Sequence, residues 1–221
     1  MVLLVHHSVS PQSRKMRLIM AEKKMLFVLK EEEPWNLSEN IQEINPSKEL
    51  PILIFDGTVI SGNNAITEYL EESNPQYKLM PEGVKERAEV RRVMEWFDIK
   101  FYNEVYKYIV SEKIIKRFHL KQAPNSKILK AGLNNLRYHM EYIDYLADKN
   151  NYLAGKDLSL ADLTAAAHLS IIDYLGDISW DEYKNAKLWY AKVKSRPSFR
   201  EILKDNIKGI HPSHNYANLD F

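Results

Sequence analysis

Cysteine is absent from the 221 residues of this sequence, and an excess of charge of either sign is lacking as well. The lack of cysteine excludes disulfides, thiolate zinc sites, iron–sulfur clusters and a cysteine nucleophile. Any sulfur chemistry must therefore use sulfur that a ligand brings. The 31 basic and 30 acidic residues leave a formal net charge of +1. That balance gives no indication of nucleic-acid binding.

Long hydrophobic runs are lacking too. No stretch approaches the roughly 18–20 uncharged apolar residues that a membrane-spanning helix needs. Residues 1–7 are apolar, but no basic segment precedes them and Arg14 and Lys15 soon follow, so we expect no signal peptide and a cytoplasmic location. Hydrophobic residues make up 45% and charged residues 28%, which is typical of globular proteins, and the length suits one large domain or two small ones.

The first 75 residues predict a compact α/β domain. Short apolar runs indicate strands, three- and four-residue spacing of apolar positions indicates helices, and Asp56-Gly57 is a hairpin turn signal. The expected order is βαβ–α–ββα, a parallel crossover followed by an antiparallel hairpin and a packing helix. The strands are expected at 3–6, 26–29, 51–55 and 59–60, and the helices at 12–24, 38–44 and 63–72.

A linker over residues 76–85, marked by Pro81 and Gly83, is expected to join this domain to an all-helical one over 86–221. The first two of its predicted helices are long and amphipathic, and the third, 160–175, is apolar almost throughout. That composition predicts a buried central helix. The four helices are expected at 90–108, 129–146, 160–175 and 182–194.

Ser159 and Asp162 are spaced as a capping box at the start of the central helix, with Asp in place of the usual Glu. Ser159 accepts from the helix backbone, and Asp162 reaches back to the Ser159 N–H. This motif is interpreted as structural, with a contribution of about 1 kcal/mol to the stability of the helix.

Ser10 lies just before the first predicted helix, whose N-terminus favours an anion. Its hydroxyl could donate a hydrogen bond to a bound thiolate. Lowering a thiol pKa from about 8.5 by two units takes roughly 2.7 kcal/mol, and one hydroxyl bond to an anion supplies about 1.5–3 kcal/mol. The simpler alternative is that Ser10 or Ser13 only caps the helix, where serine is common.

Pro51 opens a predicted strand after a loop that begins at Asn45. Proline cannot donate to a strand ladder, so it belongs at a strand start or edge. Thioredoxin-like domains carry a cis-proline here, and the preceding residue, Leu50 in this chain, offers its backbone N–H and C=O to an extended peptide. The Leu50-Pro51 sequence alone is weak evidence for a cis-proline, because about 95% of X-Pro bonds in folded proteins are trans.

Together these motifs resemble the soluble glutathione transferase family, in a bacterial, serine-type form with some zeta-like features. The similarity runs over nearly the whole chain, and four motifs follow the family's order. These are Ser10-Pro11, the loop from Asn45 to Pro51 with its zeta-like Lys48, Gly62-Asn63-Asn64-Ala65-Ile66, and Gly155 to Asp162. The segment from Arg196 to Phe199 is similar to the family's closing segment.

The resemblance implies a thioredoxin-like glutathione-binding domain (1–75) and an all-α C-terminal domain (86–221). It implies that reduced glutathione is a co-substrate, without a metal. Its sulfur would face Ser10, and its cysteinyl part would pair with the Leu50 backbone beside the proline. Its γ-glutamyl end would be held by Gly62 and Asn63. The resemblance further implies a cytoplasmic homodimer with a detoxification role, and no nucleic-acid or membrane partner.

The sequence departs from the family's pattern at Gly62 and Asn63, where relatives usually have Glu or Gln followed by Ser. Gly62 has no side-chain acceptor for the ammonium group of glutathione. Asn63 can still replace the serine, because an amide offers both a donor and an acceptor. Ser61 or Asn64 could also compensate in part. One lost charge-assisted hydrogen bond lowers affinity about 10- to 150-fold.

Three further features are interpreted as structural. The pairs His6-His7 and His211/His214 have no Cys or acidic cluster that would complete a metal site. The aromatic residues of the first back-domain helix are interpreted mainly as core, with a Tyr106 hydroxyl in the substrate pocket as an open alternative. The acidic run at 31–33 is interpreted as a solvated loop.

The preferred hypothesis is a glutathione transferase that conjugates glutathione to a small apolar electrophile through a thiolate stabilised by Ser10. One alternative is a non-enzymatic member of the same fold that binds a protein partner, as stringent starvation proteins do; Gly62 favours it. Another is a zeta-like glutathione-dependent isomerase, which rests mostly on Lys48. Fold alone does not decide among them.

Overall fold

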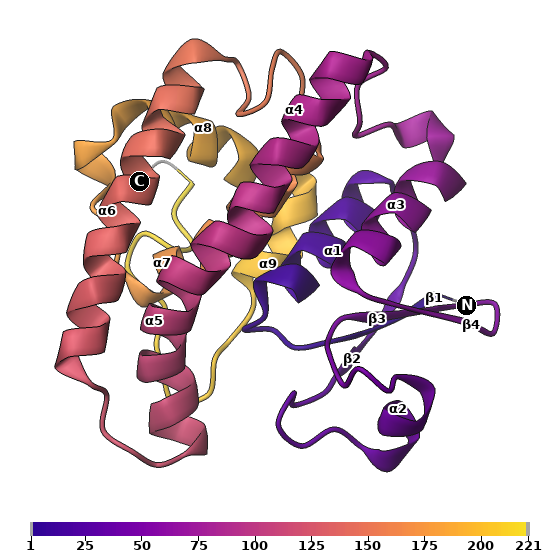
Figure 1. The fold of residues 1–221 in the computed structure, drawn as a ribbon, viewed down its shortest axis with the longest axis horizontal. Helices are drawn as coiled ribbons and strands as arrows, with labels where there is room; N and C mark the ends of the chain where they lie inside the picture. Colours follow the sequence, from indigo (N-terminus) through magenta and orange to yellow (C-terminus); the bar gives the residue numbers. More distant parts are fainter. Residues whose placement is uncertain (1, 220–221) are drawn as a thin grey trace. The chain divides into compact units, whose positions relative to one another are not determined.

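The computed structural model describes residues 2–219 and divides the chain into two compact units, Met1–Leu79 and Met80–Phe221 (Figure 1). The first is a small mixed α/β unit. The second is built from helices. This is the predicted fold class, a thioredoxin-like unit followed by an all-helical one.

The first unit is organised around a four-stranded sheet in the order β2-β1-β3-β4. β1 is parallel to β2 and antiparallel to β3, which forms a hairpin with β4. Asp56 and Gly57 connect the hairpin with φ angles of 47° and 81°, the left-handed turn that an Asp-Gly pair favours. The strands are β1 (Val2–His6), β2 (Val28–Glu31), β3 (Ile52–Phe55) and β4 (Thr58–Ser61).

Helices cover both faces of this sheet (Figure 1). α1 (Pro11–Glu22) and α3 (Asn63–Ser73) contact each other on one face. The short α2 (Glu39–Ile44) packs on the other, where Ile41 joins a core with alternate residues of β1 and β3. A short 3-10 turn, η1 (Pro75–Tyr77), follows α3.

The predicted second strand is wrong by two residues. The expected run 26–29 is apolar, but Leu26 is 93% exposed and the strand is Val28–Glu31. Lys24 leaves the helix with φ 54°, and the chain joins the sheet only when its register pairs Leu3 with Val28 and His6 with Glu31. The residues available for pairing on β1 therefore determine where this strand begins and ends, and local hydrophobicity does not.

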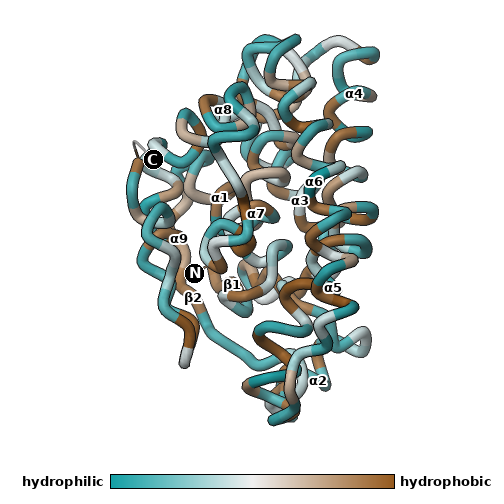
Figure 2. Tube along the Cα trace, turned by 90° about the vertical axis from the view of Figure 1, so that its left-hand side faces the viewer, coloured by the Kyte–Doolittle hydropathy of each residue, from teal (hydrophilic) through white to brown (hydrophobic). Residues whose placement is uncertain are grey.

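The second unit begins with one long helical run: α4 (Val84–Glu95), η2 (Trp96–Tyr106), α5 (Lys107–Val110) and η3 (Ser111–His119). The two η segments are π-helical, with i→i+5 bonding. Hydrophobic and hydrophilic bands alternate along α4, as an amphipathic helix requires (Figure 2). α6 (Ser126–Lys149) packs closely against α5, since a Cβ built on Gly132 would lie 2.7 Å from the Tyr108 Cβ.

The central helix α7 (Leu160–Leu175) is buried along almost its whole length, as predicted. Gly176 ends it in the left-handed conformation, with φ 73°. The predicted helix 182–194 is divided. Glu182 closes a 3-10 turn, η4 (Trp180–Glu182), and α8 begins two residues later. The remaining elements are α8 (Lys184–Lys194), η5 (Pro197–Phe199) and α9 (Arg200–Leu203).

Within the described residues, none of the helices combines the length and the hydropathy required to span a membrane.

Candidate functional site

Strand register brings the predicted site residues of the first unit to one edge of its sheet. Val5 near the end of β1 pairs with Ile52 at the start of β3, and Ile52 pairs with Ser61 at the end of β4. Three segments therefore leave the sheet at the same edge: the loop to Ser10, the Leu50-Pro51 segment, and Gly62-Asn63. All five predicted residues lie on these segments, although they span 54 positions of the sequence.

Ser10 caps α1, in agreement with the simpler of the two interpretations of this residue. Its Oγ accepts a hydrogen bond from the Ser13 N–H at 3.2 Å and donates to Gln12 Oε1 at 3.2 Å. The half-buried hydroxyl has one hydrogen and two lone pairs. It can therefore keep the cap while turning its hydrogen from Gln12 to an anion. The first turn of α1 has no acidic residue to offset its partial positive charge.

The loop before Ser10 is held from two sides at Ser8. Glu31 accepts from the Ser8 N–H at 2.8 Å and from its hydroxyl at 3.0 Å, and it also pairs with His6 at 3.0 Å. From α1, Arg14 Nε donates to the Ser8 carbonyl at 2.7 Å. These bonds orient the segment that carries the cap.

The interpretation of residues 31–33 as a solvated loop is therefore incomplete: Glu31 and Glu33 are exposed, but Glu31 belongs to β2 and Glu32 is held by hydrogen bonds. Glu31 ends β2 beside His6, and Glu32 accepts from the Ser38 N–H at 3.1 Å and hydroxyl at 2.7 Å. Hydrogen bonds from Lys30 and then from Ser38 lower the pKa of Glu32. Charge patterning could not reveal this role, because it depends on which strand lies beside β1.

His7, next to this loop, has its pKa lowered by burial, against the opposing influence of Glu31 and Glu33. Its backbone N–H donates to Ser13 Oγ at 3.2 Å, and its ring lies edge-on to Trp35 with centroids 5.2 Å apart. His7 is thus a structural residue of the loop.

The Leu50-Pro51 peptide bond is cis, as predicted. Asn45 closes the preceding loop by donating from Nδ2 to the Glu49 carbonyl at 2.8 Å and accepting from the Ser47 hydroxyl at 2.8 Å. The Leu50 side chain packs on the α2 core, and its backbone N–H and C=O have no partner among residues 2–219. An extended peptide could pair with them.

Gly62 takes φ 95° and ψ 124° before α3, a conformation that side chains other than glycine rarely adopt. A Cβ there would meet only the Ala65 Cβ, at 3.9 Å. A side chain at this position would therefore have enough space, but the backbone conformation would be unfavourable for it. Next to it, Asn63 Oδ1 is buried and has no hydrogen-bond partner among the described residues. A buried acceptor of this kind favours a donor from a ligand.

In the helical unit, Phe97, Phe101 and Tyr106 are buried, in agreement with their interpretation as core. Tyr106 stacks on Tyr102 with ring centroids 4.8 Å apart. Across residues 2–219, His, Asp and Glu side chains do not gather in threes at metal-binding distances.

Two family models match the chain: the N-terminal domain of glutathione S-transferases over residues 9–73, and their C-terminal domain over 110–206. A crystal structure of a glutathione S-transferase from Rhodospirillum rubrum is 46% identical, with full coverage of both chains and a TM-score of 0.97. FtsZ-localized protein A of Caulobacter vibrioides is 41% identical over 99% of this chain and 97% of its own.

A maleylacetoacetate isomerase of Dictyostelium discoideum is more distant, at 36% identity over 79% of this chain and 78% of its own. Both halves of the chain match the same family, and the relatives align over most of their length. The chain therefore belongs to the glutathione S-transferase family.

Proposed function

We propose that the first unit binds reduced glutathione and that the protein conjugates its sulfur to a small apolar electrophile. The observation that carries the proposal is the buried, unpartnered Asn63 Oδ1 at the sheet edge that Ser10 and the cis-proline share. It supplies an acceptor for the ammonium group that Gly62 cannot hold.

In this arrangement the γ-glutamyl ammonium donates to Asn63 Oδ1, and the γ-glutamyl carboxylate meets the free N–H groups at the start of α3. The cysteinyl part pairs with the Leu50 backbone. Ser10 donates to the sulfur while it still caps α1. The hydroxyl bond and the helix dipole favour the thiolate, and proximity then accelerates its attack on the electrophile.

The test is calorimetric titration of the protein with glutathione and with cysteinylglycine, which lacks the γ-glutamyl group. Asn63→Ala should weaken glutathione binding at least tenfold and leave cysteinylglycine unchanged. Asn64→Ala, at the exposed neighbouring position, is the matched control. Absence of heat with millimolar glutathione would refute the proposal.

Turnover is tested with a chlorinated nitroaromatic and two variants of Ser10. Ser10→Thr keeps the cap and the donor and should retain activity. Ser10→Asp keeps the cap but places a negative charge beside the thiolate, so turnover should fall at least tenfold. Equal turnover in both variants would show that Ser10 does not stabilise the thiolate, and it would leave the proposal of glutathione binding intact.

A second candidate is a partner-binding protein, favoured by the full-length similarity to FtsZ-localized protein A and by the missing acidic anchor at Gly62. In that case the chain would bind an FtsZ-type filament. Co-sedimentation with polymerised FtsZ tests it, and pelleting that persists in Asn63→Ala without glutathione would favour this function over conjugation. Isomerisation of maleylacetoacetate, measured with the same protein, tests the zeta-like alternative.

A further inference from the structure

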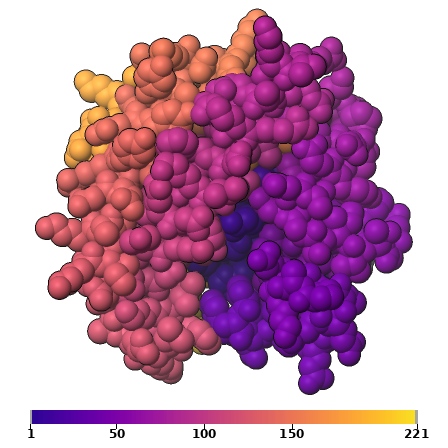
Figure 3. All heavy atoms as spheres, viewed as in Figure 1, coloured from indigo at the N-terminus to yellow at the C-terminus, as the bar shows by residue number. Residues whose placement is uncertain are grey.

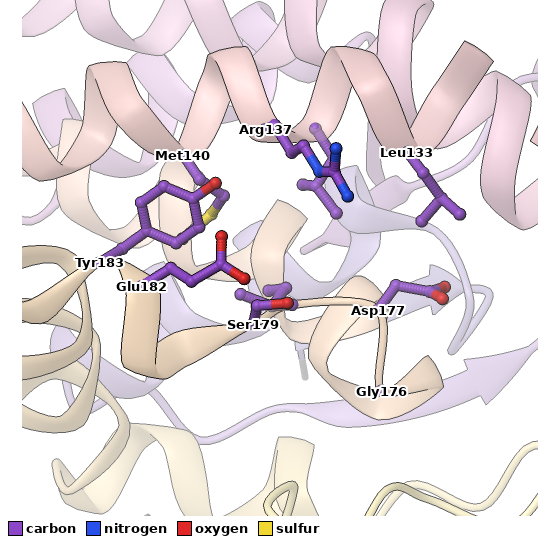
Figure 4. A pocket seen from close by; sticks show the side chains of 10 residues that line it. Leu133, Arg137, Met140, Gly176, Asp177, Ser179, Glu182 and Tyr183 are labelled. Atoms are coloured by element: carbon purple, nitrogen blue, oxygen red, sulfur yellow. The ribbon is translucent and has the colours of Figure 1, made fainter. Parts of the chain in front are cut away.

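The helical unit contains a pocket of about 270 Å³ that is lined entirely by residues between 133 and 183. One wall is α6, and the other is the loop from α7 to η4 (Figure 4). Its apolar surface comes from Leu133, Leu136 and Met140 of α6 and from Ile178 of the loop.

Side chains of opposite charge face this pocket without forming an ion pair with each other. Figure 4 shows Arg137 extending from α6 into the space and Glu182 reaching toward it from the opposite wall. Neither side chain makes a hydrogen bond or an ion pair with another described residue. The nearby Ser179 hydroxyl likewise makes no hydrogen bond within residues 2–219.

Asp177 adds a buried, half-satisfied carboxylate to the lining. Its Oδ1 accepts from Lys113 Nζ at 2.5 Å, and its side chain is only 10% exposed. Its Oδ2 is buried and has no hydrogen-bond partner in the described part of the chain. Burial raises the pKa of Asp177, and Lys113 opposes that shift. A ligand that donates a hydrogen bond would satisfy the second oxygen.

The geometry points to a binding site for a small zwitterion with an apolar body, a free α-amino acid of about the size of leucine. Its ammonium group donates to Asp177 Oδ2, its carboxylate pairs with Arg137, and its side chain lies on Leu133 and Met140. This binding does not depend on glutathione, because every contact comes from the helical unit.

The volume of the pocket suits a small ligand. A pocket of 270 Å³ holds about nine water-sized groups at ~30 Å³ each. Leucine has about that many non-hydrogen atoms, whereas drug-sized ligands occupy pockets from roughly 300 Å³ upward.

The experiment is calorimetric titration of the full-length protein with three matched probes: leucine, isopentylamine, which lacks its carboxylate, and 4-methylpentanoate, which lacks its amine. Leucine should bind in the millimolar range or tighter. Each truncated probe should bind at least tenfold more weakly, because one charge-assisted contact is lost.

Two variants locate the site. Asp177→Asn replaces the acceptor Oδ2 with a donor but can keep the bond to Lys113, and Arg137→Gln removes the carboxylate partner at an exposed position. Each should weaken leucine binding at least tenfold. Lys130→Gln and Asp181→Asn, at exposed positions outside the pocket, are the charge-matched controls and should bind leucine normally.

The proposal is overturned if leucine gives no heat at millimolar concentration, if isopentylamine binds as well as leucine, or if Arg137→Gln binds leucine like wild type. Failure of leucine binding with normal glutathione turnover would reject this site alone.

Discussion

His139 shows at the scale of one residue how burial fixes a protonation state. Trp96 Nε1 donates to His139 Nδ1 at 3.0 Å, so Nδ1 must be the unprotonated nitrogen. Nε2 then carries the hydrogen and donates to Glu104 Oε2 at 3.0 Å. Burial lowers the pKa of His139, although Glu104 opposes the shift. The neutral ring links α6 to η2.

Acid should therefore destabilise the protein through His139. In the unfolded chain its pKa is near 6.5, whereas the folded ring resists protonation until lower pH. Below about pH 6.5 the unfolded state binds the extra proton, and the free energy of unfolding falls by up to about 1.4 kcal/mol per pH unit until the folded pKa is reached. His139→Gln should flatten this dependence in urea unfolding measured from pH 7.5 to pH 5.

The exposed His214→Gln is the control for that titration, and its pH dependence should match that of the wild type. A wild-type and a His139→Gln profile with the same slope would show that His139 does not contribute.

Gly62 meets a backbone requirement at a position where a role in glutathione binding is proposed. Gly62→Ala should lower the free energy of unfolding by about 1–3 kcal/mol, because φ 95° is unfavourable for a side chain. Gly62→Glu bears the same backbone cost but restores an acidic group, so it should bind glutathione more tightly than Gly62→Ala, by at least tenfold. Urea unfolding and calorimetry separate the two effects. Equal glutathione affinities would mean that position 62 does not face the γ-glutamyl end.

Ion pairing joins whole elements in the helical unit. Asp173 of α7 and Lys194 of α8 form a buried pair at 3.2 Å, with side chains 2% and 0% exposed. Asp173 also accepts from Trp180 Nε1 at 2.9 Å, and Lys194 donates to the Asn215 carbonyl at 2.7 Å. Burial raises the pKa of Asp173 and lowers that of Lys194. The ion pair therefore links α7 to α8, and Lys194 also links α8 to the C-terminal segment.

Lys194→Met should destabilise the protein by about 3–5 kcal/mol, because it leaves the Asp173 carboxylate buried without its cation. Lys184→Met, at an exposed position on the same helix, should change stability by less than about 0.5 kcal/mol. Chemical denaturation of both variants measures the difference. The two variants losing similar stability would argue against the buried pair.

At the scale of the whole molecule, the family resemblance predicts a two-fold dimer. An aromatic surface on the helical unit is suited to that contact: Trp96 packs against Tyr142 with ring centroids 4.2 Å apart, and Tyr138 beside it is 55% exposed. Arg92 donates to the Tyr142 hydroxyl at 2.6 Å. Figure 3 shows the helical run from α4 and the neighbouring α6 together on one exposed face.

We expect sedimentation equilibrium to give twice the mass of one chain. Tyr138→Glu should shift the protein to the monomer, since it places charge in the contact. Leu188→Glu, on α8 and 71% exposed in the wild type, should leave the dimer intact. A wild-type protein that sediments as a monomer would exclude the dimer.

Features that local chemistry controls can be predicted from the amino-acid sequence alone. The cap by Ser10 and the capping box at Ser159 follow from side chains bonding to nearby backbone groups, and the Asp56-Gly57 turn follows from the left-handed conformations that this pair favours. The buried centre at α7 follows from its composition. The five predicted site residues follow from sequence motifs, and their role in binding glutathione stays a prediction.

Features that depend on partners distant in the sequence require the folded chain. Asp162 accepts not only from Ser159 but also from Trp189 Nε1 at 2.9 Å, 27 positions away. Glu31 became a support of the Ser8 loop because β2 lies beside β1, and the pocket between α6 and the α7–η4 loop joins residues far apart in sequence. The physical reason is general: local patterns report what a residue can bond, whereas packing determines which partner is within reach.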